Sequence, residues 1–554
     1  MKNKITVLLF LFFLLTGPNV FGQPTKLATP TPDQYSWHEQ GRIMFITYGP
    51  ATWQGREYDN HSTPLWRINP KQLNTDQWCR VAKSWGAKEI LFVAKHVGGF
   101  CWWPTKTTDY DISHTPYEGG KGDVLKQLSV SCKKYGLNLG IYVYPGELGS
   151  AGKTKDPSQQ ARYDKIYREQ LREVLSRYGT IKEVWFDGSC MIPVKDILAK
   201  YAPHAVVFQG PEATIRWAGN EDGILSYPAW NSLTGKDLKT GVATEAQSNP
   251  NGDAWAPLEA DVPLYTHYWF WSPEKEKTSL TLSQLMKIYY KSVGYGGVML
   301  LNATPDTTGL IPAADVKLYA ALGQEIKHRF SHPAGQVAHI RGNMAGITFQ
   351  SPTAINHAIT MEDYRHGERI RSYEIEGYEN GQWRKLAEGI SVGRKKIDYF
   401  PTIKVTRVRL RILQAAALPY IRSFAVYEVS GFKPFPDNGK TDWKECAEWS
   451  PNLFKGGHCR LKVNLTPYIP EPGQYEVKLV PTQNGGLNTF HVDSVQLYFQ
   501  GERSSPEFLI KESPLDYSVN QTQQVTRETC TELEFYLTRD KQNERGGIIL
   551  TKKE

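Results

Sequence analysis

The fold is best predicted from Ile181-Lys182-Glu183-Val184-Trp185-Phe186-Asp187-Gly188-Ser189, a short apolar stretch that ends on a carboxylate and then breaks at glycine. In a barrel of parallel strands, the carboxyl ends of the strands carry the chemistry. Asp187 at this strand end is therefore a candidate catalytic carboxylate. Asp is also a favoured helix N-cap, so the same position fits a purely structural role. The stretch alone leaves both interpretations open.

Short apolar strands and amphipathic helices alternate around this stretch, from about residue 40 to about residue 330. The pattern predicts strands near 43–46, 89–94, 139–143, 205–208 and 297–301, and helices near 72–85, 123–135, 158–178, 281–293 and 314–328. Such alternation favours a parallel (β/α) barrel over an open sheet. We therefore expect an α/β fold, with a TIM-like catalytic barrel over residues 40–331. A loop-rich segment at 210–275 lacks the expected helices, so the sequence does not settle how the barrel closes.

The pattern changes after the barrel region. Residues 369–378 and 404–412 alternate at period two between Gly, Asn and Pro, which predicts a β-sandwich over 332–431. Residues 432–439 contain two prolines and a glycine and are typical of a linker. Residues 440–554 are rich in strand and turn patterns, so we expect a C-terminal β-rich domain and one or two sandwiches in all.

The N-terminus has the pattern of a secretory signal peptide. Lys2 and Lys4 precede the apolar run from Ile5 to Leu15, and a small residue follows at Gly22. We expect a signal peptide over 1–22, a Pro- and Thr-rich extended lead-in over 23–39, and an exported protein, periplasmic or secreted. No later run of 18 apolar residues predicts a membrane span.

Seven cysteines are too few and too irregularly spaced for a disulfide framework or a metal site. Cys446 and Cys459 are the pair that proximity favours, and free buried thiols are an equal alternative. Removing the signal peptide takes away two lysines and no acids, so the formal net charge falls from +8 to +6. No basic block concentrates this charge, which argues against nucleic acid as a partner.

Aromatic residues make up 12% of the chain, including 16 Trp and 30 Tyr. Flat aromatic faces stack on pyranose rings, although they also fill protein cores. A second carboxylate, Glu259, lies in Trp255-Ala256-Pro257-Leu258-Glu259-Ala260-Asp261-Val262, with Trp269 close behind. Apolar surroundings would raise its pKa, as a general acid needs. The alternative is an exposed loop glutamate.

Polar and aromatic residues also follow the first two predicted strands. Glu57 follows the first strand, and His96 ends the second strand a few residues before Trp103. His96 could bind sugar hydroxyls or act as a buried structural donor. The sequence contains no pair of histidines at metal-ligand spacing and no Gly-x-Ser-x-Gly nucleophile motif.

Together these stretches resemble glycoside hydrolase family 29, the retaining α-L-fucosidases, and most closely its branch acting on α-1,3/1,4-linked fucose. Six blocks stand in the family's order: Lys95-His96 to Asp109-Tyr110, Gly120 to Leu137, Trp185-Phe186-Asp187-Gly188, Ile215 to Glu221, Trp255 to Val262, and Leu300-Leu301-Asn302 to Ile311. Residues 332–431 are similar to discoidin-like carbohydrate-binding modules, and a scaffold packed on the barrel is the alternative role.

The resemblance implies that Asp187 is the nucleophile and Glu259 the acid/base of a double displacement, with their carboxyl groups about 5–5.5 Å apart. It implies an oligosaccharide or glycoconjugate substrate and no cofactor or metal. The expected substrate-binding residues are His96, Glu57, Tyr48, Trp103, Trp185, Trp255 and Trp269.

The sequence departs from the family pattern around the expected sugar pocket. Thr47 or Tyr48 stands where the family has a His, and His96-Val97-Gly98-Gly99 replaces its His-His-Asp-Gly. The Arg that often follows the acid/base segment is replaced near Tyr265. Lost polar partners change which hydroxyls a pocket accepts. The same chemistry on a related sugar such as an α-L-galactoside, and a non-catalytic carbohydrate-binding protein, are therefore the alternatives.

Overall fold

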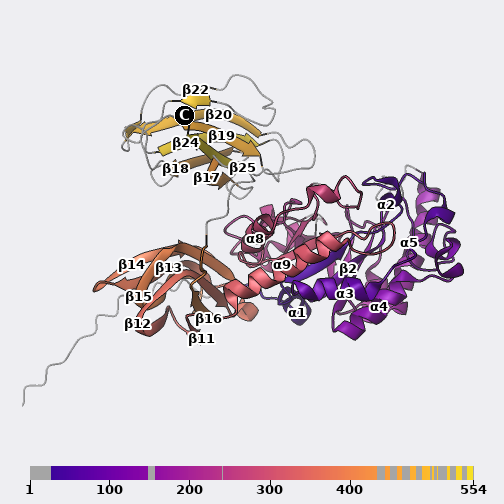
Figure 1. Ribbon diagram of the computed structural model, residues 1–554, viewed down its shortest axis with the longest axis horizontal. Helices are drawn as coiled ribbons and strands as arrows, with labels where there is room; N and C mark the ends of the chain where they lie inside the picture. Colours follow the sequence, from indigo (N-terminus) through magenta and orange to yellow (C-terminus); the bar gives the residue numbers. More distant parts are fainter. Residues whose placement is uncertain are drawn as a thin grey trace, which may run out of the picture.

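The computed structural model describes residues 27–146, 156–239, 241, 243–266 and 268–432, and the backbone of the strands between 443 and 552 (Figure 1). The expected signal peptide, the first part of the lead-in and the side chains of Cys446 and Cys459 lie outside the described part. Within that part, Cys79, Cys101, Cys132 and Cys190 are free, buried thiols.

Eight parallel strands form the first domain, in the order β5-β4-β3-β2-β1-β10-β9-β6. Their bounds are β1 (Arg42–Ile46), β2 (Glu89–Lys95), β3 (Asn138–Val143), β4 (Ile181–Trp185), β5 (Val206–Phe208), β6 (Arg216–Trp217), β9 (Leu258–Val262) and β10 (Val298–Ala303). A parallel bridge between Phe208 and Ile215 joins the two ends of the sheet. The predicted barrel is confirmed, and this bridge closes it.

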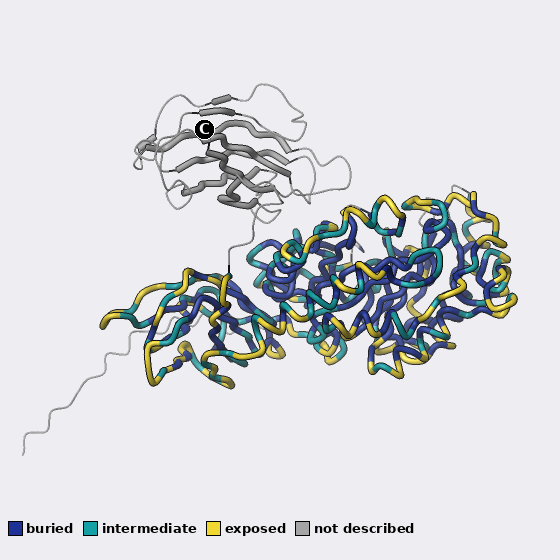
Figure 2. Tube along the Cα trace, in the orientation of Figure 1, coloured by how far each residue is buried: buried dark blue, intermediate teal, exposed yellow. Residues whose placement is uncertain are grey.

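Helices cover the outside of the barrel, and its strands run through a deeply buried centre (Figures 1 and 2). The longer helices are α3 (Thr75–Ser84), α4 (Val124–Tyr135), α5 (Pro157–Arg177), α6 (Lys195–Tyr201), α8 (Leu282–Lys291) and α9 (Ala313–Phe330). Asp123 caps α4 by accepting the Lys126 backbone N–H at 2.9 Å. Short turns of helix occur in the loops: α2 (Ala51–Gln54), α7 (Gly235–Leu238), η1 (Leu65–Arg67), η2 (Ile112–His114), η3 (Tyr117–Gly119), η4 (Glu245–Gln247) and η5 (Glu276–Thr278).

The loop-rich segment between β6 and β9 is organised around a buried cation. Its described residues form the short strands β7 (Ser232–Leu233) and β8 (Ala254–Trp255), besides α7 and η4. The Arg216 guanidinium donates to the carbonyl oxygens of Trp230 at 2.6 Å, Thr244 at 3.0 Å and Ala256 at 3.0 Å. The guanidinium group of one arginine thus satisfies three backbone carbonyl groups of a segment that has little helix of its own.

The end of the lead-in is helical, which corrects the expectation of an extended segment. Helix α1 (Pro32–His38) begins with a capping box between Thr31 and Gln34, with Pro at its first position. Trp37 on α1 is fully buried and donates its indole N–H to Glu183 Oε2 inside the barrel at 2.8 Å. Helix α1 therefore closes the end of the barrel that lies opposite the carboxyl ends of the strands.

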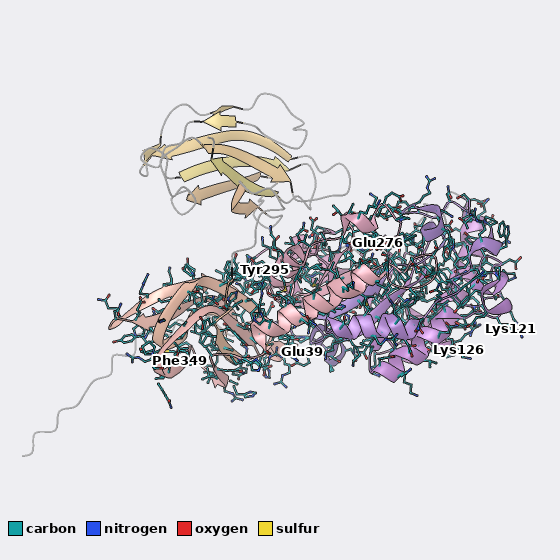
Figure 3. The ribbon with its side chains drawn as sticks, viewed as in Figure 1. Glu39, Lys121, Lys126, Glu276, Tyr295 and Phe349 are labelled. Atoms are coloured by element: carbon teal, nitrogen blue, oxygen red, sulfur yellow. The ribbon has the colours of Figure 1, made fainter. Side chains whose placement is uncertain are left out.

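An antiparallel β-sandwich follows α9, in the strand order β11-β16-β12-β15-β13-β14. Its strands are β11 (Gly335–Arg341), β12 (Met344–Glu362), β13 (Ile370–Glu379), β14 (Gln382–Gly389), β15 (Lys396–Ala415) and β16 (Tyr420–Tyr427), with the turn η6 (Tyr364–His366). Arg422 pairs with Glu39 of the barrel at 2.9 Å (Glu39 is labelled in Figure 3), and Tyr364 donates its hydroxyl to the same carboxylate. These contacts hold the sandwich against the barrel.

The strands beyond 443 form two antiparallel sheets, β17-β25-β19-β23 and β18-β24-β20-β21, with β22 paired to β20. Their bounds are β17 (Trp443–Trp449), β18 (His458–Asn464), β19 (Tyr475–Pro481), β20 (Phe490–Phe499), β21 (Glu502–Arg503), β22 (Phe508–Leu509), β23 (Gln521–Gln523), β24 (Glu532–Arg539) and β25 (Gly546–Lys552). Among the helices that the structure describes, none is both long and apolar enough to cross a bilayer.

A prediction concerns the packing of α9 against the end of α3. A Cβ added at Gly323 would clash with the Ser84 carbonyl and lie 2.7 Å from Trp85 Cα. Ala normally stabilises a helix interior relative to Gly, but here the overlap should dominate. We expect Gly323→Ala to lower the free energy of unfolding by about 1–3 kcal/mol, measured by thermal unfolding.

The matched control is Gly346→Ala in β12, because a Cβ there meets only the Val408 carbonyl oxygen at 3.9 Å. We expect this control to change stability by at most about 0.5 kcal/mol. Equal stability of the two variants would contradict the close approach of α9 to α3.

Candidate active site

A cavity of about 420 Å³ opens at the carboxyl ends of the barrel strands, within the roughly 300–1,000 Å³ typical of small-molecule sites. The residues that line it are Phe45, Thr47, Glu57, Tyr58, Val93, His96, Tyr142, Trp185, Asp187, Gly188, Gln209, Trp217, Glu221, Thr244, Asp261 and Trp269. The expected residues Asp187, His96, Glu57, Trp185 and Trp269 thus lie together in one pocket.

Asp187 lies just beyond the end of β4. The chain turns sharply there, because Gly188 and Ser189 have φ of 69° and 74°. Asp187 caps no helix, since the next helix, α6, has Val194 at its N-cap position. Burial raises the pKa of Asp187, and hydrogen bonds from the Tyr142 hydroxyl, at 3.0 Å, and the Gly188 N–H oppose that rise. These two donors favour the ionised form that a nucleophile needs.

Trp185 forms the floor beneath this carboxylate. Its ring stacks on Phe208 with centroids 3.9 Å apart and lies against Tyr142 at 5.2 Å. The indole N–H donates to Glu259 Oε2 at 2.8 Å, on the side away from the pocket. The Trp185 ring is therefore an apolar platform that is held in one orientation.

Two further carboxylates meet at Trp269. The Trp269 indole donates to Glu221 Oε2 at 3.1 Å, and its backbone N–H donates to Glu57 Oε1 at 2.9 Å. Burial raises the pKa of Glu221, and the charge of Asp187 raises it further. Burial raises the pKa of Glu57 to about 7, and the charge of Glu221 adds to that shift. Both groups therefore hold a proton more readily than a glutamate surrounded by water.

Asp261 is the fourth carboxylate of the pocket. It accepts the Trp217 indole N–H at 2.5 Å and is almost fully buried. Burial, followed by the charge of Glu221, raises its pKa well above the usual value. Asp261 is thus suited to hydrogen bonding as a neutral acid rather than to nucleophilic attack.

His96 contributes a neutral imidazole. Burial lowers its pKa to about 4. The ring lies between Tyr58, at 6.1 Å, and Tyr142, at 5.6 Å, and its Nδ1 has no hydrogen-bond partner among the described residues. A ligand hydroxyl in the pocket could supply that partner.

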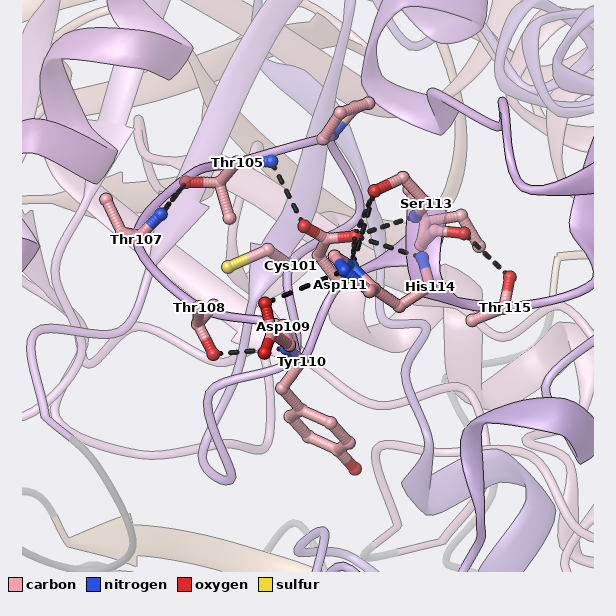
Figure 4. Close-up of polar contacts among 12 residues, drawn as sticks. Cys101, Thr105, Thr107, Thr108, Asp109, Tyr110, Asp111, Ser113, His114 and Thr115 are labelled. Carbon is pink, nitrogen blue, oxygen red and sulfur yellow. Dashed lines mark hydrogen bonds and ion pairs between the residues drawn. The ribbon is translucent and has the colours of Figure 1, made fainter.

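The loop after β2 is fixed by a buried aspartate (Figure 4). Asp111 accepts the Thr105 backbone N–H at 3.1 Å and the Ser113 hydroxyl at 2.6 Å. Within the same loop, the Tyr110 hydroxyl donates to Asp59 at 2.7 Å. Asp59 lies two residues after Glu57 in the chain. The loops that carry His96 and Glu57 are therefore tied to each other.

Glu259 lies below the pocket, which corrects its expected position. It is 0% exposed, so it is not an exposed loop residue, and it is not among the pocket-lining residues. Side chains on a strand alternate, so Glu259 and Asp261 face the same way along β9, and Asp261 is the one that reaches the pocket. Trp185 hydrogen-bonds Glu259 from the pocket side, so the two-carboxylate geometry expected for Asp187 and Glu259 is not what the structure shows.

Tyr48 also lies outside the pocket. Its neighbour Thr47 lines the cavity and donates its hydroxyl to Asn302 Oδ1 at 2.8 Å. Tyr48 points the other way and stacks on Trp102 with centroids 4.5 Å apart. The alternation of side chains explains the exchange of the two positions.

Trp103 and Trp255 have structural positions instead of the expected ones. Trp103 is fully buried and donates its indole N–H to Glu173 of α5 at 2.8 Å. Trp255 stacks on Tyr364 at the border with the sandwich, with centroids 5.7 Å apart and an interplanar angle of 7°. Both rings belong to packing interfaces and not to the pocket lining.

Sequence reasoning missed several pocket residues that carry polar groups: Tyr58, Tyr142, Gln209, Trp217, Glu221, Thr244 and Asp261. Glu221 and Trp217 stood in the family-like block from Ile215 to Glu221, which was a signal without an assigned role. Tyr142 lies within a strand and is marked only by its place in β3. No group of His, Cys, Asp or Glu in the described part is arranged to hold a metal ion.

Comparisons with known proteins point in one direction. A family model described as Alpha-L-fucosidase matches residues 31–328. Alpha-L-fucosidase 1 of Arabidopsis thaliana is 28% identical over 488 residues, covering 77% of this chain and 94% of that protein. A putative alpha-L-fucosidase 1 of Oryza sativa is 27% identical, covering 76% and 92%. A crystal structure of a putative alpha-L-fucosidase from Bacteroides thetaiotaomicron is 32% identical, with a TM-score of 0.68, covering 73% of this chain and 100% of that one.

A prediction follows from the raised pKa of Glu57. Between about pH 4.5 and 7 the folded chain holds a proton that the unfolded chain has released, so stability falls as the pH rises through this range. Glu57→Gln keeps an acceptor for the Trp269 N–H and removes the titration. As the pH rises through this range, we expect the unfolding free energy of Glu57→Gln to increase relative to that of the wild type by about 1–2 kcal/mol. This is less than the whole pKa shift would give, because the Glu57 side chain is partly solvated.

The measurement is urea unfolding of both proteins at about pH 4.5 and about pH 7.5. Glu274→Gln, at an exposed glutamate, is the matched control. A stability difference between Glu57→Gln and the wild type that is the same at both pH values would contradict the prediction.

Proposed function

The chain belongs to the α-L-fucosidase family, and from that premise we propose that it hydrolyses terminal α-L-fucosyl residues by a retaining double displacement. The observation that supports the proposal most is the meeting of Asp187 and Glu221 in one closed-ended pocket, with one carboxylate held by two donors and the other held toward its protonated form.

Asp187 is the proposed nucleophile. It stands at the carboxyl end of a barrel strand, where barrel enzymes place their catalytic groups. The Tyr142 hydroxyl and the Gly188 N–H stabilise its negative charge. Its pocket is apolar on one side because of Trp185, so a sugar ring could rest there with its anomeric carbon near the carboxylate.

Glu221 is the proposed acid/base, in place of the Glu259 that the sequence favoured. Its pKa responds to the charge of Asp187, so the two groups act on each other across the pocket. The pKa of Glu57 is raised by burial and by the charge of Glu221. A general acid must stand opposite the nucleophile, so Glu221 fits better than Glu57. Trp269 holds both glutamates in place.

The reaction then has two steps. Asp187 attacks the anomeric carbon while Glu221 gives its proton to the leaving oxygen, and a glycosyl ester forms on Asp187. Glu221, now a carboxylate, takes a proton from water, and that water attacks the anomeric carbon and frees Asp187. The pKa of Glu221 changes between the two steps. While Asp187 is ionised, its charge raises the pKa of Glu221 and keeps the acid protonated. In the glycosyl ester Asp187 is uncharged, so the pKa of Glu221 falls and Glu221 can act as a base.

The pocket favours the end of a glycan. Its volume of about 420 Å³ and its floor of Trp185 over Phe208 suit a single buried ring. Branched oligosaccharides with α-1,3/1,4-linked fucose are the substrates that the six sequence blocks suggest, and export from the cell agrees with the N-terminal pattern.

A panel of aryl α-L-glycosides tests the reaction and the sugar. We expect the wild type to release fucose in preference to galactose, with retention at the anomeric centre by NMR. Asp187→Ala should lose about 10³-fold or more in kcat, because no other group can form the glycosyl ester. Preference for the galactoside would change the sugar. Glycan binding with no turnover of any glycoside would favour a carbohydrate-binding protein.

A second prediction separates Glu221 from Glu57. Glu221→Ala should lose about 10²–10⁴-fold in kcat/KM on natural glycans and much less on aryl fucosides with good leaving groups, which need little protonation. Added azide should restore turnover of the aryl substrate by displacing Asp187 from the glycosyl ester, and so yield a glycosyl azide that retains the anomeric configuration of the substrate. Glu57→Ala is the matched control. If that variant shows the azide-dependent pattern and Glu221→Ala does not, the two roles are exchanged.

A further inference from the structure

Three glutamates lie inside the barrel below the pocket, although none of them lines it. Glu89 on β2, Glu183 on β4 and Glu259 on β9 are all 0% exposed. Isolated buried charges are costly, so carboxylates in such a place are normally paired with cations or neutralised. The described residues show no metal-binding cluster there, so bound protons are the remaining means of lowering the charge of these carboxyl groups.

Each of these carboxyl groups receives one donor and leaves one oxygen without any. The donors to the Oε2 atoms are Gln40 Nε2 to Glu89 at 2.7 Å, the Trp37 indole to Glu183 at 2.8 Å, and the Trp185 indole to Glu259 at 2.8 Å. The Oε1 atoms of all three glutamates have no donor among the described residues.

Trp185, which donates to Glu259, lies two residues beyond Glu183 on the same face of β4, so the two carboxyl groups are neighbours inside the barrel, and each shifts the pKa of the other. Carboxylate oxygens only accept hydrogen bonds, so a hydrogen bond between their unsatisfied oxygens needs a proton on one of the two groups. That proton would satisfy the oxygens that no other donor reaches. Two like charges this close cannot both persist in a buried site, as in pairs of carboxyl groups that share one proton.

Among the described residues, no cation acts on the pair in place of this proton. The titratable groups that face the pair are Glu89 from β2 and Asp261, two residues farther along β9. Lys182 acts on Glu89 from the other side of β4 and donates to Ser36 at 3.2 Å. The interior faces of the other strands at this depth supply apolar side chains: Ile43, Leu91, Val206 and Val298.

We propose that Glu183 and Glu259 share one proton and that this singly protonated pair is the positioning device for Trp185, the floor of the catalytic pocket. The proposal rests on the proposed site, and it does not depend on which sugar is bound. A continuous row links Trp37, Glu183, Glu259 and Trp185, from the helix that closes the barrel to the pocket floor. Glu259 thus acts through Trp185 and not on the substrate.

The pair also predicts a response to pH. Burial raises the pKa of Glu183 well above its usual value and that of Glu259 to about 8. The folded chain therefore holds protons that the unfolded chain releases at lower pH, so stability falls as the pH rises from about 4.5 to about 8. Above that range the pair would become two repelling charges, and Trp185 would lose its fixed acceptor geometry.

The experiment uses amide variants that mimic the protonated acid. In Glu183→Gln the amide N–H can donate to Glu259, and in Glu259→Gln it can donate to Glu183 while the carbonyl still accepts the Trp185 N–H. We expect infrared spectra of the wild type near neutral pH to show the carbonyl stretch of a buried protonated carboxylic acid. Neutral Asp261 absorbs in the same region, so the readout is a difference spectrum: each single variant should lose one such band relative to the wild type, because the remaining carboxylate then accepts from the amide. Glu274→Gln, the matched control at an exposed glutamate, should lose none.

Kinetics supply the second readout. We expect Glu259→Ala to lose about tenfold or more in kcat on an aryl fucoside and Glu259→Gln to restore most of that loss, because the amide keeps the partners of Trp185 satisfied. Unfolding of both Gln variants should depend less on pH between about 4.5 and 8 than that of the wild type.

Two results would overturn the proposal. One is a difference spectrum that shows no loss of protonated-acid absorption, relative to the wild type, in both Glu183→Gln and Glu259→Gln. The other is loss of turnover in Glu259→Gln that azide restores on an aryl substrate, which would make Glu259 the acid/base. The infrared and unfolding measurements need no turnover, so they remain decisive even if the protein hydrolyses no fucoside.

Discussion

Side-chain alternation along β4 is the constraint on which the rest of the structure depends. Every second residue of a barrel strand points inward, so Glu183, Trp185 and Asp187 form one column from the buried interior to the pocket. The top of the column is a carboxylate held by Tyr142, its middle is an aromatic platform, and its base is a carboxyl group held by Trp37. Neighbouring strands repeat the arrangement: on β9, Asp261 reaches the pocket and Glu259 lies beneath it. The distance of a carboxyl group below the pocket therefore determines its role in this barrel, because that distance decides which donors it contacts and how much water reaches it.

The same depth rule sorts the protonation states. Burial raises the pKa of each pocket carboxyl, and the local donors decide which one still ionises. Asp187 has two donors directed at its charge. Glu221 has one donor, and the charge of Asp187 opposes its ionisation. Asp261 is the most deeply buried and feels the charge of Glu221. Groups with separated proton affinities are what acid/base chemistry on one sugar requires, and they arise here from position alone.

The sequence predicted the barrel because strand and helix periodicities repeat along the chain, and it predicted Asp187 because a strand end is visible as an apolar run followed by glycine. It could not predict which of two carboxyls on one strand is accessible. Glu259 and Asp261 share a face, and choosing between them requires knowing how far β9 extends relative to β10, where Glu259 pairs with Val298. The prediction that Tyr48 lines the pocket was wrong for a related reason: a one-residue step along a strand reverses the direction of the side chain. Helix α1 was hidden among Pro and Thr, although Thr31 and Gln34 form a capping box that could have revealed it.

The sandwich packs against the part of the barrel that has almost no helix. The segment between β6 and β9, which carries Glu221, has almost no helix of its own and depends on borrowed hydrogen bonds. Some come from Arg216 within the barrel. Others come from the sandwich: Glu368 accepts both the backbone and the side-chain N–H of Asn231, at 3.0 and 2.7 Å, and Arg371 donates to the Pro250 carbonyl at 2.6 Å. A buried loop needs its polar groups satisfied, and these contacts satisfy them where a barrel helix would otherwise stand. The sandwich therefore acts as part of the scaffold of the catalytic domain, since it fixes the segment that presents Glu221 to Asp187.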